Sequence, residues 1–317
     1  MNDVQAVDRF SEKFLALKKE IGRNIVGQNE VVHQTLLSLF CGGHCLLIGV
    51  PGLAKTKLVQ TISQALDLSF KRIQFTPDLM PSDILGTEIL DSNKEFVFRE
   101  GPLFANMILA DEINRTPPKT QSSLLEAMQE RVVTVSGDTK KLPQPFFVMA
   151  TQNPIEQEGT YPLPEAQLDR FMFSIHLDYP SIAEEIDIIK QTTTETAIDL
   201  NQVLTGQEIL DIQSLVRKIP VTDNVYEYAV KLVARTRPQS EMSSEIAKKY
   251  ISWGAGPRAS QYLILAAKCA AITKGKYSPD IEDVQEIAFP VLNHRIFRNY
   301  QAEADAFSVS KIIQSIL

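Results

Sequence analysis

The first forty residues place hydrophobic side chains at helical spacing. Between residues 4 and 21 these side chains recur in alternating steps of three and four positions, which is the period of an amphipathic helix. A second helical pattern covers residues 29–40 and ends at Gly42 and Gly43, and glycine commonly follows the end of a helix. The chain is therefore predicted to begin with two helices.

From Cys45 onwards, short apolar runs alternate with helical segments. Continuous apolar runs between helices are typical of parallel strands that are covered on both faces. The pattern therefore predicts a doubly wound α/β domain with a parallel sheet. The predicted strands are residues 45–49, 70–75, 107–111, 146–152 and 171–177.

Two segments interrupt this alternation. Residues 87–99 and 131–144 each consist of two short β-prone stretches around a polar turn, Asp91–Lys94 in the first and Ser136–Asp138 in the second. Such a pattern is typical of a β-hairpin. We therefore predict two β-hairpins inserted into the α/β domain.

The strand pattern ends at Pro180, and the remaining segments have helical spacing. Prolines separate several of these segments, as expected for connections between helices. We predict an α/β domain at residues 1–195 and a smaller, all-helical domain at residues 196–317. The predicted helices of the C-terminal part are residues 182–192, 206–218, 224–236, 257–272 and 280–294.

The segment GVPGLAKT, residues 49–56, follows the first predicted strand and opens a predicted helix. This is the context of a Walker A phosphate loop, in which backbone N–H groups and the helix N-terminus bind phosphates. Lys55 would contact the β- and γ-phosphates of ATP, and the Thr56 hydroxyl would bind Mg²⁺. The alternative is an ordinary strand-to-helix turn with a solvated lysine. The predicted nucleotide-binding residues here are Gly49, Pro51, Gly52, Leu53, Ala54, Lys55, Thr56 and Lys57.

One position of this loop departs from the consensus. Ala54 stands where the motif has glycine immediately before the lysine. If Ala54 has helical dihedral angles, its methyl group is tolerated, and the substitution weakens the motif only slightly.

The strand at residues 107–111 leads into two acids, Asp111 and Glu112, as in a Walker B motif. Asp111 would hold Mg²⁺ together with Thr56, and Glu112 would polarise the attacking water. Isolated acids after a strand are often solvated or cap a helix. The order of the two motifs in a doubly wound domain favours the catalytic interpretation. Asn153, which follows the strand at 146–152, could hold the catalytic water or contact the γ-phosphate, or could simply form an Asn-Pro turn.

Composition and charge narrow the possible functions. The chain of 317 residues is 44% hydrophobic, as in ordinary globular proteins, and its net charge of -7 argues against general binding to nucleic acid. We expect no secretory signal and no membrane span, because the longest apolar run, residues 262–272, is short and contains Lys268. The three cysteines lie in apolar contexts, which favours a reduced cytoplasmic setting. Cys41, His44 and Cys45 lack the further ligands of a zinc site.

Five segments of the sequence, including the phosphate loop and the acid pair, together closely resemble the MoxR family of AAA+ ATPases. The resemblance covers nearly the whole chain. The resemblance implies an αβα nucleotide domain, a helical lid and a hexameric or related ring of identical subunits with active sites between them. It also implies that residues 86–100 are the helix 2 insert and residues 131–144 the pre-sensor 1 hairpin. Gly256 is a departure, since serine is expected there. The segments that carry the resemblance are GVPGLAKT (49–56), LADEINR (109–115), ATQNP (150–154), EGTYPLPEAQLDRF (158–171) and GPRAS (256–260).

The resemblance also implies roles for residues that local patterns leave open. Arg258 matches the sensor 2 arginine, which contacts the γ-phosphate, and Arg170 matches the arginine finger, which acts on ATP in a neighbouring subunit. A lone arginine beside a strand is more often part of a surface salt bridge. Val26 and Gly27 match the segment that lines the adenine, although a loop with buried aliphatic residues fits them equally well.

The function implied is an ATP- and Mg²⁺-dependent ATPase that remodels, assembles or matures a protein partner. MoxR relatives are regarded as chaperones that often act with partners containing von Willebrand factor A domains. A DNA-directed motor is an alternative, which the net charge of -7 disfavours. A scaffold gated by nucleotide without turnover is another, disfavoured by the presence of Glu112, Asn153 and Arg170.

Overall fold

The computed structural model describes residues 3–155, 159–193 and 199–317. Its centre is a five-stranded parallel sheet in the order β2-β5-β8-β1-β9. All five predicted strands are present, so the predicted doubly wound fold is confirmed. The predicted boundary between residues 195 and 196 lies outside the described residues. The strands are β1 (Cys45–Ile48), β2 (Phe70–Gln74), β5 (Met107–Asp111), β8 (Phe147–Gln152) and β9 (Phe173–His176).

Strands β1, β5, β8 and β9 are buried on both faces of the sheet, whereas the edge strand β2 is largely exposed. Successive side chains of a strand point to opposite faces. In β1, Leu47 belongs to one core cluster and Leu46 to the other, and in β8 Met149 and Val148 divide in the same way. Both faces therefore need apolar residues, which explains the continuous apolar runs. The helices around the sheet are α1 (Asp3–Gly22), α2 (Asn29–Phe40), α3 (Lys55–Ala65) and α5 (Pro118–Glu130).

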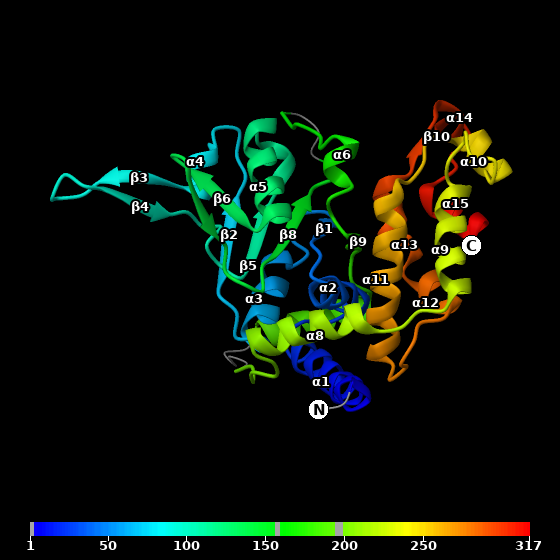
Figure 1. Cartoon of the computed structure of the whole chain (residues 1–317), viewed down its shortest axis with the longest axis horizontal. Coiled ribbons are helices and arrows are strands. Elements are labelled where there is room, and N and C mark those ends of the chain that lie inside the picture. The colour runs from blue at the N-terminus through cyan, green and yellow to red at the C-terminus, as the bar shows by residue number, and fades with distance from the viewer. Residues whose placement is uncertain (1–2, 156–158, 194–198) are drawn as a thin grey trace.

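Both predicted hairpins are present as two-stranded antiparallel sheets. The first pairs β3 (Gly86–Leu90) with β4 (Phe96–Glu100), follows the short helix α4 (Pro81–Leu85) and projects far from the body of the molecule (Figure 1). The second pairs β6 (Val132–Val135) with β7 (Asp138–Lys141) and follows α5 directly.

The C-terminal part is mostly helical. Helix α8 (Gly206–Lys218) runs beneath the sheet beside α1 and α2, and the helices from α9 onwards gather at one side of the sheet (Figure 1). The predicted single helix at residues 280–294 is wrong: it is broken into two short helices and a 3₁₀ turn. Pro290 has no N–H to donate to the carbonyl of residue 286, and its ring clashes with that carbonyl, so the helix is interrupted ahead of Pro290, at Ile287. Helix α6 (Glu165–Leu168) precedes β9. The helices after β9 are α7 (Ile182–Thr192), α8 (Gly206–Lys218), α9 (Asp223–Arg235), α10 (Glu245–Tyr250), α11 (Pro257–Thr273), α12 (Ile281–Glu286), α13 (Ala288–Leu292), α14 (Tyr300–Ala304) and α15 (Val309–Ile316).

A small ribbon within this part was not predicted. It pairs β10 (Ile251–Trp253) with β11 (Phe297–Arg298) in antiparallel fashion. Strands of two or three residues are too short to show alternation in a sequence. Across residues 3–155, 159–193 and 199–317, each helix is too short or too polar to cross a lipid bilayer.

Candidate active site

The predicted phosphate loop and acid pair meet at one edge of the sheet. Strands β5, β8 and β1 are adjacent and parallel, so their carboxyl ends lie side by side. Ligands of open α/β sheets bind at this edge. The segments that follow these strands contain Gly49–Ala54 after β1, Glu112 after β5 and Asn153 after β8.

The phosphate loop connects β1 to α3 with its lysine at the start of the helix. Gly52 has a φ of 87°, a conformation that suits glycine. Lys55 is the first residue of α3, and its Nζ donates a hydrogen bond to the Gly49 carbonyl. Burial lowers the pKa of Lys55, and the negative charges of Asp111 and Glu112 act in the opposite direction. The lysine is thus close enough to both acids to be affected by their charge.

Ala54 has the dihedral angles φ 53° and ψ 27°, in the left-handed region. Ala54 therefore lacks the ordinary helical dihedral angles at which its methyl group would cost little. An L-residue in this region costs roughly 1–2 kcal/mol, which glycine avoids. The geometry explains why the motif has glycine here, and the loop of this chain contains local strain.

The two acids are joined by a buried threonine of the neighbouring strand. The Thr151 hydroxyl donates to Oδ1 of Asp111 at 2.7 Å and accepts from the backbone N–H of Glu112 at 2.8 Å. Glu112 itself has a φ of 58°. Thr151 is 1% exposed, so water does not compete for its hydroxyl. This one side chain therefore fixes both the Asp111 carboxylate and the backbone turn that directs Glu112.

Strand β2 provides further partners for both acids. Arg72 donates to Oδ2 of Asp111 from Nε at 3.1 Å and from Nη2 at 2.6 Å. Gln74 accepts from Arg72 at 2.7 Å and donates to Oε2 of Glu112 at 2.8 Å. Arg115 also pairs with Glu112, at 3.2 Å. Sequence reasoning missed Arg72 and Gln74 because they lie in a strand without a motif.

Asn153 lies one residue beyond the end of β8 and is 7% exposed. Its side-chain oxygen accepts a hydrogen bond from the backbone N–H of Ile155 at 3.1 Å. Asn153 thus stabilises the turn after the strand and stands at the same edge as the acid pair. Its role toward water or phosphate stays a prediction.

Asp169, which directly follows α6, forms ion pairs with the predicted Arg258 and with Arg295. Arg258 pairs with Oδ2 of Asp169 at 3.2 Å, while Oδ1 accepts from Nε of Arg295 at 2.7 Å. Arg170 follows Asp169 in the chain and is half-buried. Within the described part of the chain, neither Arg170 nor Arg258 forms an ion pair with Asp111 or Glu112. Sequence reasoning missed Asp169 and Arg295 as partners.

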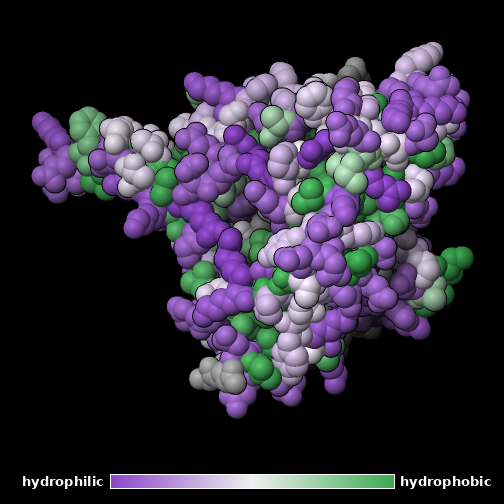
Figure 2. Space-filling model, turned by 45° about the vertical axis from the view of Figure 1, so that its right-hand side comes forward, coloured by the Kyte–Doolittle hydropathy of each residue, from purple (hydrophilic) through white to green (hydrophobic). Residues whose placement is uncertain are grey.

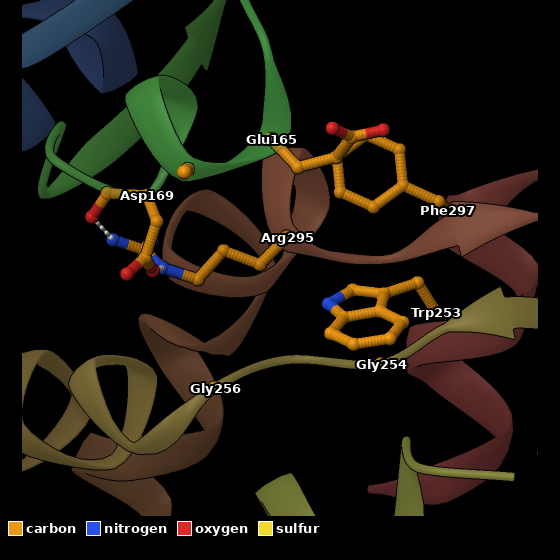
Figure 3. Close-up of a pocket in the computed structure, with 8 residues that line it drawn as sticks. Glu165, Asp169, Trp253, Gly254, Gly256, Arg295 and Phe297 are labelled. Atoms are coloured by element: carbon orange, nitrogen blue, oxygen red, sulfur yellow. Dashed lines mark hydrogen bonds and ion pairs between the residues drawn. The ribbon is translucent and has the colours of Figure 1, made fainter.

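A pocket of about 490 Å³ adjoins this junction. Figure 3 shows Asp169 and Arg295 on one side of it and Trp253 and Phe297 of the β10–β11 ribbon on the other. Glu165 reaches over it from α6. The pocket therefore lies between the sheet-bearing part of the chain and the C-terminal ribbon.

The predicted adenine segment borders a pocket of about 120 Å³ beside the phosphate loop. Val26 lines the pocket together with Ala54 and Lys57. Gly27 has a φ of 78°, and a Cβ atom there would lie 2.7 Å from Cδ of Glu184 in α7. The positive φ favours glycine at this position. The role of this segment toward adenine stays a prediction.

The oxygen groups at this edge suit a magnesium ion. Mg²⁺ prefers oxygen ligands and often binds through one carboxylate together with substrate phosphates. Asp111 would provide that carboxylate and Thr56, the second residue of α3, a hydroxyl. These residues are of the right chemical type for the metal that the sequence predicts.

Comparisons with known proteins identify the family of this chain. Residues 44–173 match the model of the ATPase family associated with various cellular activities (AAA), and residues 243–316 match the AAA lid domain. Chaperone MoxR1 of Mycobacterium tuberculosis is 45% identical over 94% of this chain and 79% of its own length. This chain belongs to the MoxR family of AAA+ ATPases.

Other MoxR relatives and a solved structure extend the match. Protein MoxR of Paracoccus denitrificans is 28% identical over 86% of this chain and 85% of its own length. A crystal structure of a protein from Cytophaga hutchinsonii superposes with a TM-score of 0.92 at 42% identity, covering 98% of this chain and 95% of that one. The predicted MoxR resemblance and the predicted α/β fold with a helical lid are confirmed. Membership of this family implies binding of a nucleotide with a divalent metal.

The cysteine and histidine cluster before β1 has a structural role in this MoxR chain. His44 is buried, accepts from the backbone N–H of Val148 at 3.0 Å through Nδ1, and donates to the Met128 carbonyl at 3.0 Å through Nε2. Both ring nitrogens are thereby used. Burial also raises the pKa of the Cys45 thiol, which keeps it protonated.

Proposed function

We propose that this protein hydrolyses the β–γ phosphoanhydride of ATP, with Mg²⁺, at sites between identical subunits, and uses the energy to remodel or assemble a protein partner. The observation that carries the proposal is the Thr151 hydroxyl, which links Asp111 to the backbone of Glu112 beside the phosphate loop. A pair of solvated acids would need no such buried support.

The roles follow from chemistry and position. Lys55 would neutralise charge on the β- and γ-phosphates, and Asp111 with Thr56 would hold the metal. Glu112 would orient and polarise the attacking water, a contribution of a positioned base typically worth ~10²–10⁴ in rate. The metal would draw charge from the phosphate oxygens when bound. Asn153 and Arg258 would contact the γ-phosphate, and Val26 and Gly27 would contact the adenine.

Two observations support assembly into a ring, in which Arg170 would act on a neighbour's ATP. First, helix α7 exposes apolar side chains at helical spacing: Ile182 is 81% exposed, Ile186 48% and Ile189 54%. Exposed apolar stripes of this kind often mark protein interfaces. Second, Ile188 of the same helix lines the pocket beside the phosphate loop. A subunit that covers α7 would thus approach the nucleotide.

The projecting hairpin supports a protein partner rather than DNA. Phe96 is 75% exposed and Leu90 56%, with Ile89 and Val97 also exposed. Figure 2 shows apolar side chains along this projection, with hydrophilic ones at its end. Apolar exposed surface suits a protein ligand, whereas nucleic acid binding relies on basic side chains.

The deciding experiment replaces Glu112 with Gln. The Glu112→Gln protein should still bind ATP with Mg²⁺ in calorimetry, while turnover falls by ~10²–10⁴. Glu126→Gln, at an exposed site on α5, is the matched control and should hydrolyse ATP like the wild type. Lys55→Ala should lose ATP binding. Wild-type turnover in Glu112→Gln would refute the catalytic assignment, and stimulation of turnover by DNA would favour the DNA-directed alternative.

Assembly has its own test. Arg170→Ala chains retain the phosphate loop, and Lys55→Ala chains retain Arg170. If the site is shared between subunits, a mixture of the two should regain ATPase activity that neither variant has alone. The absence of this recovery, together with a specific activity that is independent of protein concentration, would show that each chain works by itself.

A further inference from the structure

The segment that carries Arg170 is bound along its backbone by side chains of the lid. Arg295 donates hydrogen bonds to the carbonyls of Asp169 at 2.9 Å, Phe171 at 2.6 Å and Met172 at 3.2 Å. The Tyr262 hydroxyl donates to the remaining carbonyl of this run, that of Arg170, at 3.4 Å. Four consecutive carbonyls are thus held from the lid, although the donors lie some 90–125 positions later in the chain.

Arg295 can hold this segment because its charged guanidinium is buried and donates hydrogen bonds to several backbone carbonyls. The residue is 3% exposed, so its guanidinium needs both a counterion and hydrogen-bond acceptors. The Asp169 carboxylate accepts from Nε at 2.7 Å, and the Tyr262 ring lies 5.1 Å from the guanidinium carbon. Lysine could not reproduce these contacts, since it has a single nitrogen rather than a planar fork of donors.

Asp169 connects this arrangement to the predicted sensor. One carboxylate oxygen of Asp169 faces Arg295 and the other faces Arg258 at 3.2 Å. Figure 3 shows Asp169 and Arg295 in contact at the edge of the pocket beneath α6. The predicted sensor and the predicted finger segment are therefore joined through Asp169, which precedes Arg170 in its motif, and Arg295, which lies outside both motifs.

We propose that Arg295 is a positioning residue, which fixes the Asp169–Met172 segment to the lid so that Arg170 follows the lid's movement. The inference rests on the proposed ATPase function and on the action of Arg170 across the subunit interface. A lid that shifts when Arg258 contacts phosphate would then carry Arg170 with it. The nucleotide bound to one subunit would thereby determine the position of the arginine finger that this subunit offers to the next subunit.

The test is a complementation experiment with Arg295→Lys in the full chain. This variant should bind ATP with unchanged affinity, because its own phosphate loop is intact, while turnover falls by ~10–100-fold, the typical effect of a catalytic group displaced by about 1 Å. Mixing it with Lys55→Ala chains, which offer an intact finger, should restore activity. Mixing it with Arg170→Ala chains should not, since both would then lack a working finger. Arg298→Lys, on the exposed ribbon strand, is the matched control and should behave as wild type.

The outcomes separate this inference from the function on which it rests. Recovery in the Arg170→Ala and Lys55→Ala mixture, without recovery in the Arg295→Lys and Lys55→Ala mixture, would overturn the role of Arg295 alone. Failure of both mixtures would overturn the shared site and this inference with it. If Arg295→Lys does not fold, as judged by thermal melting, Asp169→Asn takes its place, because it removes the counterion of the buried guanidinium and so weakens the hold of Arg295 on the segment. Asp169→Asn should then show the same pattern of recovery, and a defect that no partner chain restores would overturn the proposal.

Discussion

Arg72 donates two hydrogen bonds to one carboxylate oxygen of Asp111, with the shorter at 2.6 Å, and Asp111 is the proposed metal ligand. The two side chains come from adjacent strands, and the ion pair neutralises the carboxylate before any metal does. A Mg²⁺ ion that binds Asp111 must therefore compete with a guanidinium.

Replacement of Arg72 should strengthen metal binding. We expect Arg72→Gln to lower the Mg²⁺ concentration at which nucleotide binding is half-maximal. The shift should be several-fold rather than larger, because Arg72 is 47% exposed and solvent screens the pair. Calorimetric titration of ATP at a series of Mg²⁺ concentrations measures it. Lys71→Gln, at the neighbouring exposed position, should leave the curve in place, and an equal shift in both variants would point to a general charge effect.

Removal of the Thr151 hydroxyl should separate turnover from binding. In Thr151→Val, Oδ1 of Asp111 and the N–H of Glu112 both lose a buried partner, at a cost of ~1–3 kcal/mol for each unsatisfied group. The unsatisfied groups should lower the melting temperature. Turnover should fall by at least ~10-fold, because the Asp111 carboxylate and the turn that directs Glu112 are no longer held in place. Thr151→Ser keeps the hydroxyl and should retain most activity. Equal losses in both variants would show that the methyl group, not the hydrogen bonds, is what matters.

Replacing Ala54 with glycine should remove the backbone strain at this position. In Ala54→Gly, the left-handed conformation costs nothing, although the unfolded chain gains freedom, so the free energy of unfolding should rise by roughly 0.5–1 kcal/mol. Urea unfolding measures this change. The same substitution at Ala65, within α3, should destabilise the protein, because that residue is in a right-handed helix. A lower free energy of unfolding in Ala54→Gly would show that the backbone at Ala54 is not strained.

Acid should weaken the fold through His44. Burial lowers its pKa to about 4, against an ordinary value near 6.5, so the unfolded chain takes up a proton between these two values and the folded protein does not. The contribution of neutral His44 is therefore complete above pH ~6.5 and falls as the pH drops toward 4, by ~3 kcal/mol in total. Unfolding by urea at several pH values measures the slope. His44→Gln should flatten it between pH 4 and 6.5, and an unchanged slope would assign the acid sensitivity to other groups.

The sequence was sufficient to predict the sheet, both hairpins and the acid pair because each has a local signature. An apolar strand followed by Gly49–Thr56, or by Asp111 and Glu112, can be recognised within a few residues. Parallel strands then place these segments at one edge by topology alone.

The remaining features depend on contacts between distant positions or on backbone geometry. Arg295 and Asp169 are 126 positions apart, and nothing near either residue indicates the other. Arg72 lies in a strand whose alternation shows only that its side chain is polar. The left-handed angles of Ala54 follow from the path of the chain between β1 and α3, which the residue type does not determine.

The β10–β11 ribbon has a practical consequence. It carries Trp253, the chain's single tryptophan, 67% exposed and facing the Asp169–Arg295 junction across the pocket. Indole emission is sensitive to the polarity around the ring, so a rotation of the ribbon that covers or uncovers Trp253 changes the intrinsic fluorescence of the unmodified protein. The molecule thus contains its own optical reporter, and stopped-flow recording of that one fluorophore would follow the approach of the two halves in real time without a dye.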